Sequence, residues 1–189
     1  MSPKAAPAKK IVATTSLAGC FGCHMSLLDI DERLFDLIEL VEFHKSPIDD
    51  IKTFTKECDI GLVEGGCCND ENVHVLREFR KHCKTLVAVG ECAIMGGLPA
   101  MRNTIPLKEC LDEAYLGGAT VADCNPGRVI PCDPDIPKIL NRVYPCHEVV
   151  KMDYFLPGCP PSADLIWDAL VALVSGKELA LEYRTFKFD

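Results

Sequence analysis

The stretch Ile11–Cys23, IVATTSLAGCFGC, decides how the rest of the chain is interpreted. Its first five residues carry no charge and are mostly β-branched, which is typical of a short buried strand. A C-x-x-C pair, Cys20 and Cys23, follows together with Gly19 and Gly22. Two thiolates at that spacing can hold one metal ion or one cluster, and glycine lets the backbone approach it closely. The sequence therefore predicts a metal or redox site directly after the first strand.

The remainder of the chain repeats this unit of strand, loop and helix. Apolar runs at 40–43, 59–64, 85–89 and 149–155 predict four further strands. Apolar periodicity predicts helices at 25–40, 71–83 and 163–174, capped by Asn69 or Asp70 and by Ser162, with Gly176 ending the last helix. We therefore expect an α/β fold: a flavodoxin-like, doubly wound parallel sheet with strand order 2-1-3-4-5.

Other segments carry weaker signals. Glycine and proline punctuate residues 93–143, where helical patches are predicted at 107–115 and 136–143, and a helical turn is predicted from Pro47 toward Cys58. Residues 1–10 are predicted to form a disordered tail, because they combine Ala, Pro and Lys without apolar periodicity. One iron-sulfur domain is expected over 11–176, followed by an extended C-terminal segment at 177–189.

Composition narrows the class of protein. The 189 residues are 48% hydrophobic, which suits one domain with a sizeable core. Asp and Glu number 28 against 20 Lys and Arg, giving a net charge of -8, which argues against nucleic acid as a partner. No apolar run approaches the length of a membrane span, and no signal peptide opens the chain. We expect a soluble, cytoplasmic protein without a membrane partner.

The chain has twelve cysteines, which is a large number for a cytoplasmic protein. Cys58, Cys83 and Cys110 stand where a helix or strand core would accept a small apolar residue. Others follow the predicted strands: Cys20 and Cys23 the first, Cys67 and Cys68 the third, Cys92 the fourth and Cys159 the fifth. The carboxyl ends of parallel strands meet at one edge of a sheet, so these loops can converge on one ligand.

Glycines accompany these cysteines, and their exposed backbone N–H groups suit a cluster, whose sulfides accept hydrogen bonds. Cysteines from dispersed loops fit a 4Fe-4S cubane. Structural zinc is an alternative, although it usually takes two close cysteine pairs that staple a small fold. A thioredoxin-type dithiol at Cys20 and Cys23 is another, but it leaves Cys92 unexplained. FMN is a third, because residues 14–16 resemble the hydroxyl-rich phosphate loop of flavodoxins.

Four motifs together resemble the small subunit of NiFe hydrogenases, most closely the short subunit of the cytoplasmic, bidirectional NAD-reducing type. They are GCFGC after the first strand, Glu64-Gly65 after the third, GECA at 90–93 and PGCPP at 157–161. The resemblance implies that Cys20, Cys23, Cys92 and Cys159 are the ligands of one proximal 4Fe-4S cluster. It also implies that this chain has no catalytic residue. The chain would instead relay electrons from the nickel-iron centre of a large subunit to a diaphorase. That diaphorase would carry flavin and iron-sulfur clusters and reduce NAD.

The resemblance leaves several residues open. The related complex I subunits have two adjacent cysteines at the first motif, whereas the adjacent pair Cys67-Cys68 lies after the third strand and has no assigned role. Glu64 is expected either to relay protons or to cap a loop. Phe21 and His24 are expected at the large-subunit interface.

An apolar surface is expected around the cluster loops, bounded by Phe21, Met25, Ile94, Met95 and Leu98. The roles of three further cysteines, Cys124, Cys132 and Cys146, stay open.

Overall fold

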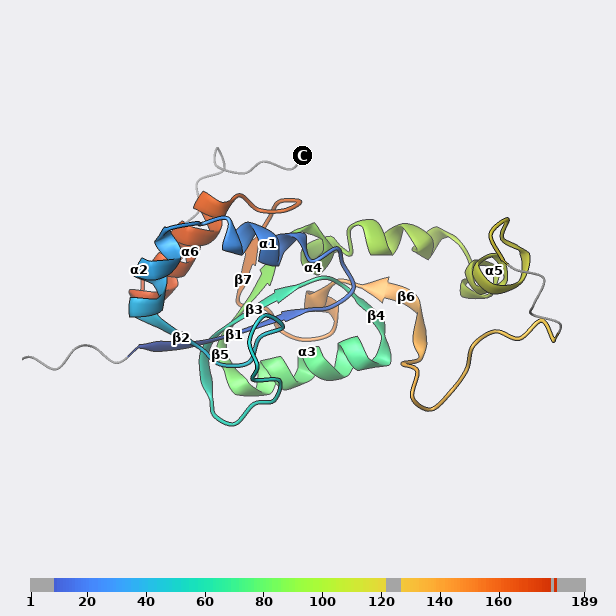
Figure 1. The fold of residues 1–189 in the computed structure, drawn as a ribbon, viewed down its shortest axis with the longest axis horizontal. Helices are drawn as coiled ribbons and strands as arrows, with labels where there is room; N and C mark the ends of the chain where they lie inside the picture. The colour runs from blue at the N-terminus through green and yellow to red at the C-terminus, as the bar shows by residue number, and fades with distance from the viewer. Residues whose placement is uncertain (1–8, 122–126, 178, 180–189) are drawn as a thin grey trace, which may run out of the picture.

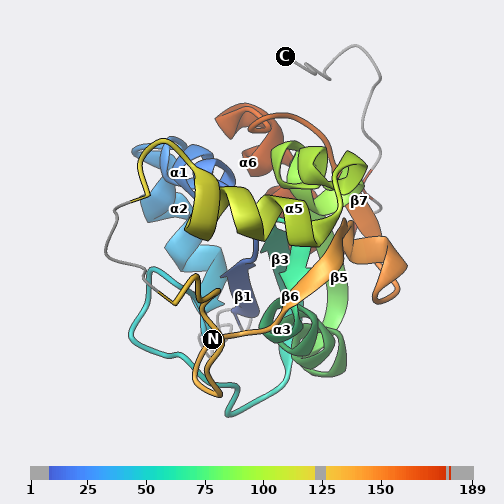
Figure 2. The ribbon, with the colours of Figure 1, turned by 90° about the vertical axis from the view of Figure 1, so that its right-hand side faces the viewer.

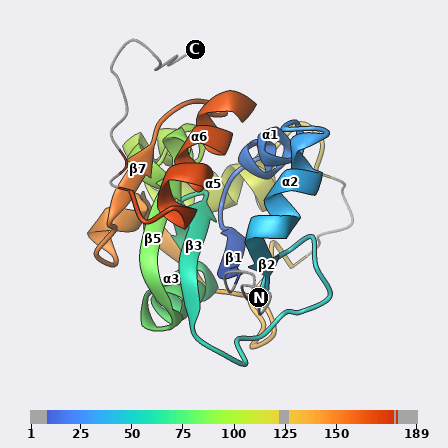
Figure 3. The same ribbon diagram turned by 90° about the vertical axis from the view of Figure 1, so that its left-hand side faces the viewer.

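The computed structural model describes residues 9–121, 127–177 and 179. Five parallel strands form the central sheet in the order β2-β1-β3-β5-β7, which is the predicted order 2-1-3-4-5 once the strands of this sheet are counted along the chain. Figure 3 shows the five side by side, with β7 and β2 at the two edges. The flavodoxin-like expectation is thus confirmed. The strands of the sheet are β1 (Lys10–Ser16), β2 (Val41–Phe43), β3 (Cys58–Glu64), β5 (Cys83–Val89) and β7 (Tyr154–Leu156).

Helices cover both faces of the sheet (Figure 1). On one face α1 (Gly22–Leu28), α2 (Arg33–Leu40) and α6 (Ala163–Val174) pack their apolar residues onto Val12, Leu62 and Val87. On the other face α3 (Asp70–His82) and α4 (Glu91–Met95) pack against Val63 and Leu86. Alternate residues of one strand therefore serve two separate cores, as the pleat of a strand requires.

The side chains of Asn69 and Ser162 cap α3 and α6 as predicted. Asn69 accepts a hydrogen bond from the Asn72 backbone N–H at 2.8 Å, and Ser162 accepts one from Leu165 at 3.3 Å. Both helices begin where the sequence places them, α3 within one residue. Each cap satisfies a backbone donor that the first turn of a helix leaves without a partner.

The helix predicted at 25–40 is wrong as one unit. The chain forms α1 and α2 instead, separated by a turn in which Asp31 has a φ of 59°. The turn lets Ile30 and Leu37 both reach the same core, where they are 1% and 0% exposed.

The middle section departs furthest from prediction. The patch at 136–143 is not a helix: β6 (Ile139–Tyr144) pairs antiparallel with β4 (Cys67–Asn69) in a two-stranded ribbon. Residues 47–58, which the structure describes throughout, form no helix either. The strand predicted at 149–155 shortens to β7, because a 3-10 turn, η3 (Cys146–Glu148), and an irregular segment precede it.

The predicted helix at 107–115 is confirmed as α5 (Leu107–Asp112), which continues into a π-helical turn, η2 (Glu113–Gly117). A 3-10 segment, η1 (Leu98–Thr104), precedes it. In Figure 1 this stretch runs from α4 away from the sheet, and in Figure 2 α5 lies in front of it.

The predicted ends of the chain are tested only in part. Residues 1–8 and most of 177–189 lie outside the described residues, while Lys10, assigned to the predicted tail, already belongs to β1. Among the described residues no helix is long and apolar enough to cross a membrane.

Candidate metal centre

Four loops at the carboxyl ends of the strands enclose one hollow of about 360 Å³, counted with its opening to solvent. Cys20 and Cys23 reach it from the β1–α1 connection, Cys92 from the start of α4 and Cys159 from the β7–α6 connection. All four cysteines that the resemblance selects therefore line the same hollow, although the last lies 139 positions after the first along the chain. The switch point of the doubly wound sheet is what brings them together.

Two glycines leave the space that the Cys23 and Cys92 sulfurs of this site occupy. Gly90 has a φ of +82°, and a Cβ added there would lie 2.4 Å from the Cys23 Sγ. Gly97 has a φ of +49°, and its Cβ would lie 2.9 Å from the Cys92 Sγ. Any other residue would fill the space beside these two sulfurs and strain the backbone. These two glycines thus leave a space around the sulfurs, which we call the cradle. Such a space fits an inorganic core bound there.

Glu91 joins two of the cysteine loops. Its side-chain Oε1 accepts a hydrogen bond from the Gly158 backbone N–H at 3.1 Å, and its own N–H donates to the Gly158 carbonyl at 3.0 Å. The Gly90 N–H also donates to the Leu156 carbonyl at 2.8 Å. The loop of Cys92 is therefore held to that of Cys159 by three hydrogen bonds.

Two thiols of this site, those of Cys23 and Cys92, have raised pKa values. Burial raises the pKa of Cys23, and the neighbouring Glu64 carboxylate raises it further. Burial also raises the pKa of Cys92, with Cys159 and Cys20 contributing. Thiolates crowded in this way need a cationic centre to balance their charge. An iron core would supply that balance, so the four cysteines fit the cluster that the sequence predicts.

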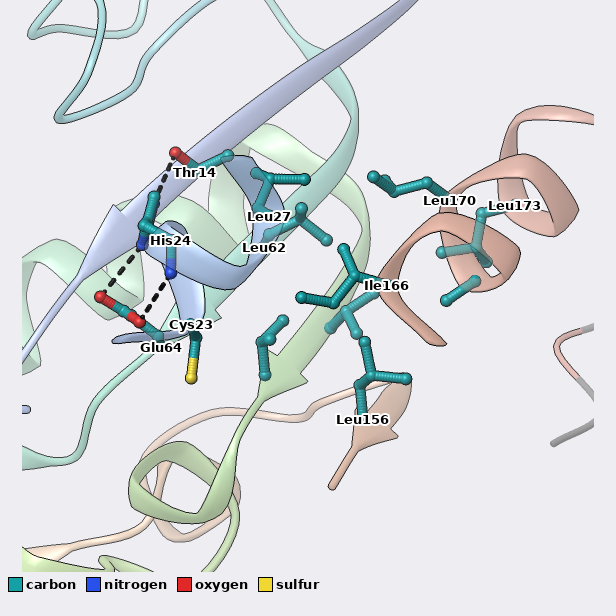
Figure 4. Close-up of a pocket in the computed structure, with 13 residues that line it drawn as sticks. Thr14, Cys23, His24, Leu27, Leu62, Glu64, Leu156, Ile166, Leu170 and Leu173 are labelled. Carbon is teal, nitrogen blue, oxygen red and sulfur yellow. Dashed lines mark hydrogen bonds and ion pairs between the residues drawn. The ribbon is translucent and has the colours of Figure 1, made fainter. Parts of the chain in front are cut away.

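Glu64 and His24 form a buried polar group beside Cys23 (Figure 4). The His24 Nδ1 lies 3.0 Å from Glu64 Oε1, and the His24 backbone N–H donates to Glu64 Oε2 at 3.2 Å. The other ring nitrogen of His24 lies 2.9 Å from the Thr14 hydroxyl. Burial alone would raise the pKa of Glu64, but hydrogen bonds from His24 and Ser16 outweigh it and the pKa lies below its usual range. This group anchors the start of α1 to β1 and β3.

An apolar cavity opens on the other side of this polar group (Figure 4). Leu62 of the sheet and Ile166 and Leu170 of α6 face it. Cys23 lies between this cavity and the hollow and lines both. One of the four thiols is thus shielded by hydrocarbon on one side.

Two predictions about neighbouring residues need correction. His24 is 4% exposed and holds Glu64 and Thr14, so it is no interface residue. The interface expected at Phe21 stays a prediction: this residue is half-buried, and its ring stacks on that of His24, with centroids 4.6 Å apart. Thr14 and Thr15 are buried, and the Thr14 hydroxyl contacts His24 and Ser46, so this stretch offers FMN no open phosphate loop.

The remaining cysteines differ in how deeply they are buried. Cys58 and Cys83 are buried as predicted, on paired positions of β3 and β5, while Cys110 is half-buried. Cys67 and Cys146 are buried, and the Cys146 thiol donates to the Gly65 carbonyl at 3.4 Å. The further cysteines are Cys68, whose thiol contacts Asn72 Oδ1, Cys132, which is exposed, and Cys124, which lies outside the described residues.

Sequence reasoning missed Glu91, and it gave Thr14 a different role from the one that the structure shows. Glu91 lies inside the GECA motif, so its proximity to Cys92 could have marked it, but its bond to Gly158 depends on how two distant loops meet. Thr14 was noted only as part of the hydroxyl-rich stretch 14–16, and its contact with His24 depends on how α1 packs on β1. Among the described residues, no three His, Cys, Asp or Glu side chains converge closely enough to hold a single metal ion.

Together the fold and the hollow define a class: flavodoxin-like domains that present cysteines from separate loops at the carboxyl edge of a parallel sheet. The model of the NADH ubiquinone oxidoreductase 20 Kd subunit family matches residues 20–173. The chain belongs to this family, within which it is a homologue of NiFe-hydrogenase small subunits.

Particular relatives sharpen this assignment. The delta subunit of the NAD-reducing hydrogenase HoxS of Cupriavidus necator is 51% identical over 180 residues, covering 94% of this chain and 85% of that protein. A subunit of the F420-non-reducing hydrogenase of Methanothermobacter thermautotrophicus is 38% identical; the match covers 92% of this chain and 56% of the longer relative. A crystal structure of NAD+-reducing NiFe-hydrogenase in the H2-reduced state contains a chain that is 50% identical, with a TM-score of 0.91, covering 96% of this chain and all of that one.

Proposed function

We propose that this chain is the electron-transfer small subunit of an NAD-reducing NiFe hydrogenase and holds one 4Fe-4S cluster on Cys20, Cys23, Cys92 and Cys159. The observation that carries the proposal is the convergence of these four thiols on one glycine-lined hollow. The 51% identity to a subunit of an NAD-reducing hydrogenase supports the same activity. When bound, the cluster would take up and release single electrons.

The chain's own residues tune such a site through burial and hydrogen bonding. The Leu98 backbone N–H points to the Cys92 sulfur, and the Gly90 and Gly97 positions leave room close to the sulfurs. Donors to a ligand sulfur and exclusion of water are the main means by which a protein sets a cluster's potential. Glu64 serves the site by holding His24 and hence the start of α1, a structural role.

We further propose two partners: a hydrogenase large subunit that carries the nickel-iron centre, and a diaphorase with flavin and iron-sulfur clusters. The apolar surface predicted around the loops supports this, because Met25, Met95 and Leu98 are 52%, 60% and 73% exposed. These residues follow the candidate ligands on α1 and just after Cys92, while Phe21 and Ile94 are half-buried. Exposed apolar residues grouped beside a redox centre are typical of a subunit interface. We place the complex in the cytoplasm, as the sequence predicts.

The experiment is iron and acid-labile sulfide analysis with low-temperature EPR on the anaerobically purified complex, comparing Cys159→Ala with Cys132→Ala. We expect about four irons and four sulfides per chain from this site in the wild type and the Cys132 control. Cys159→Ala should lose the reduced-cluster signal and hydrogen-dependent NAD reduction. Stoichiometric zinc without sulfide, a bound flavin in place of iron, or an unchanged Cys159→Ala spectrum would contradict the proposal.

A further inference from the structure

A second apolar surface lies away from the cysteine hollow, on α2. The helix buries Leu37 completely, yet Phe35 and Ile38 are 73% and 45% exposed. Together with Leu28, at the end of α1 remote from the hollow, these side chains line an open groove of about 630 Å³. We call this surface the α2 groove; its lining residues are Leu28, Asp31, Glu32, Leu34, Phe35 and Ile38.

The pattern of burial shows that the fold does not depend on the exposed apolar side chains of the α2 groove. Leu34, Leu37 and Val41 already supply the contacts of this region to the core. The apolar side chain of Phe35 therefore adds no core contact in the isolated chain. A contiguous exposed apolar patch on a helix is typical of a binding surface. In Figures 1 and 3 α2 lies on the outer side of the helix layer, where nothing else in the described chain covers it.

The rim of the α2 groove is acidic. Asp31 and Glu32 line the groove, and three further exposed carboxylates belong to the same turn and helix: Asp29, Asp36 and Glu39. The two described cations at this face are already engaged. Arg33 bonds Asp164 at 2.9 Å and lies over the Trp167 ring, and the Lys9 ammonium donates to the Ile38 carbonyl.

Charge complementarity identifies the occupant. We infer that the α2 groove docks an apolar segment with basic flanking residues, supplied by another subunit of the hydrogenase complex. A second copy of this chain fits poorly, because a two-fold contact through the groove would set one acidic rim against another. The inference rests on the proposed function only in taking the chain to be part of a heteromeric complex.

A photo-cross-linker tests the contact in the assembled complex. Phe35 is replaced by benzoylphenylalanine, which keeps an aromatic side chain there, and the complex is irradiated and mapped by peptide mass spectrometry. We expect a cross-link to a partner-subunit peptide with apolar residues flanked by Lys or Arg. A cross-link to a second copy, to residues 180–189 of the same chain, or to a peptide without basic residues would overturn the inference, as would no cross-link.

Substitution gives an independent measurement. Phe35→Asp should weaken assembly with the partner by at least tenfold, and Glu32→Lys by a smaller factor that shrinks at high salt. The matched control is Ile51→Asp, an exposed apolar residue on the loop after β2. Iron content of the isolated chain should stay at the wild-type value in all three variants. If the wild type itself binds no hydrogenase subunit, the proposed function fails; if it assembles and Phe35→Asp assembles equally well, only this inference fails.

Discussion

At the residue scale, the most demanding positions are those where a side chain is forbidden. Gly90 combines a left-handed φ with contact to the Cys23 sulfur, so it meets a conformational and a steric requirement together. Gly176, after α6, has a similar φ of +67° but no atom within 4 Å of an added Cβ. A substitution at Gly176 would therefore cause backbone strain alone, whereas a substitution at Gly90 would cause backbone strain and also crowd the site.

We therefore expect Gly90→Ala and Gly176→Ala to differ. Both should lose roughly 1–2 kcal/mol of unfolding free energy, because alanine is strained at positive φ. Gly90→Ala should also lose most of its bound iron, since its Cβ displaces the Cys23 sulfur. Denaturant unfolding and iron analysis on both variants check this; full iron content in Gly90→Ala would show that the cradle is dispensable.

Glu91 provides a second prediction at this scale. Glu91→Gln keeps an acceptor for the Gly158 N–H, whereas Glu91→Ala removes it and leaves that buried donor without its partner. The Cys159 loop should then move relative to Cys92. We expect a broadened or shifted EPR signal and a changed midpoint potential in Glu91→Ala, and a near-native signal in Glu91→Gln. Identical spectra for both variants would rule out this positioning role.

At the element scale, the helices and strands that the sequence predicted correctly are those that depend on neighbouring residues along the chain. Strand positions follow from unbroken apolar runs, and α3 and α6 from capping residues followed by a periodic stripe. Glycine after a strand narrows the cysteines without selecting the four, because Cys67 also follows a glycine there; the four were chosen through the resemblance to hydrogenase small subunits. What failed depends on contacts between distant segments: β6 carries a helix-like mixture of residues, but Asn103 and Arg102 hold its backbone to η1 and fix it as a strand beside β4.

The α3 cap gives a direct test at this scale. Asn69→Ala removes the acceptor for the Asn72 N–H and should cost about 1 kcal/mol of unfolding free energy. Asn69→Asp keeps the acceptor and adds a charge that the helix dipole favours, so it should match or exceed the wild type. Thermal or urea unfolding checks both. Equal stability of Asn69→Ala and Asn69→Asp would mean that the cap contributes nothing.

At the scale of the whole molecule, stability depends on pH through carboxylates that tie elements together. Asp153, just before β7, accepts hydrogen bonds from Arg80 of α3 at 2.6 Å and from the Leu86 N–H of β5 at 2.8 Å. Partial burial alone would raise the pKa of Asp153, but these two donors outweigh it and the pKa is lowered. A lowered pKa in the folded state means that the charged form stabilises the fold.

The sign of the pH effect follows. The contribution of Asp153 is fully present above its unfolded pKa of about 4 and is lost as pH falls through the lower folded pKa. Asp153→Asn should lose roughly 1–3 kcal/mol at pH 7 and show a shallower loss of stability on acidification. Urea unfolding at a series of pH values measures this. A constant difference between variant and wild type across that range would exclude linkage through Asp153.

The spread of the four cysteines along the chain has a consequence for assembly. A bound cluster would tie Cys20 to Cys159 and so close a loop of more than one hundred residues, as a long-range disulfide does. Cross-links over such loops restrict the unfolded ensemble most, on the order of 4–5 kcal/mol in the chain-entropy model. Cys159 is synthesised only after the other three, so the site is complete only once the chain has been made as far as Cys159. Cluster insertion would thus be a late step, which cross-links loops that the folded sheet has already brought close to one another.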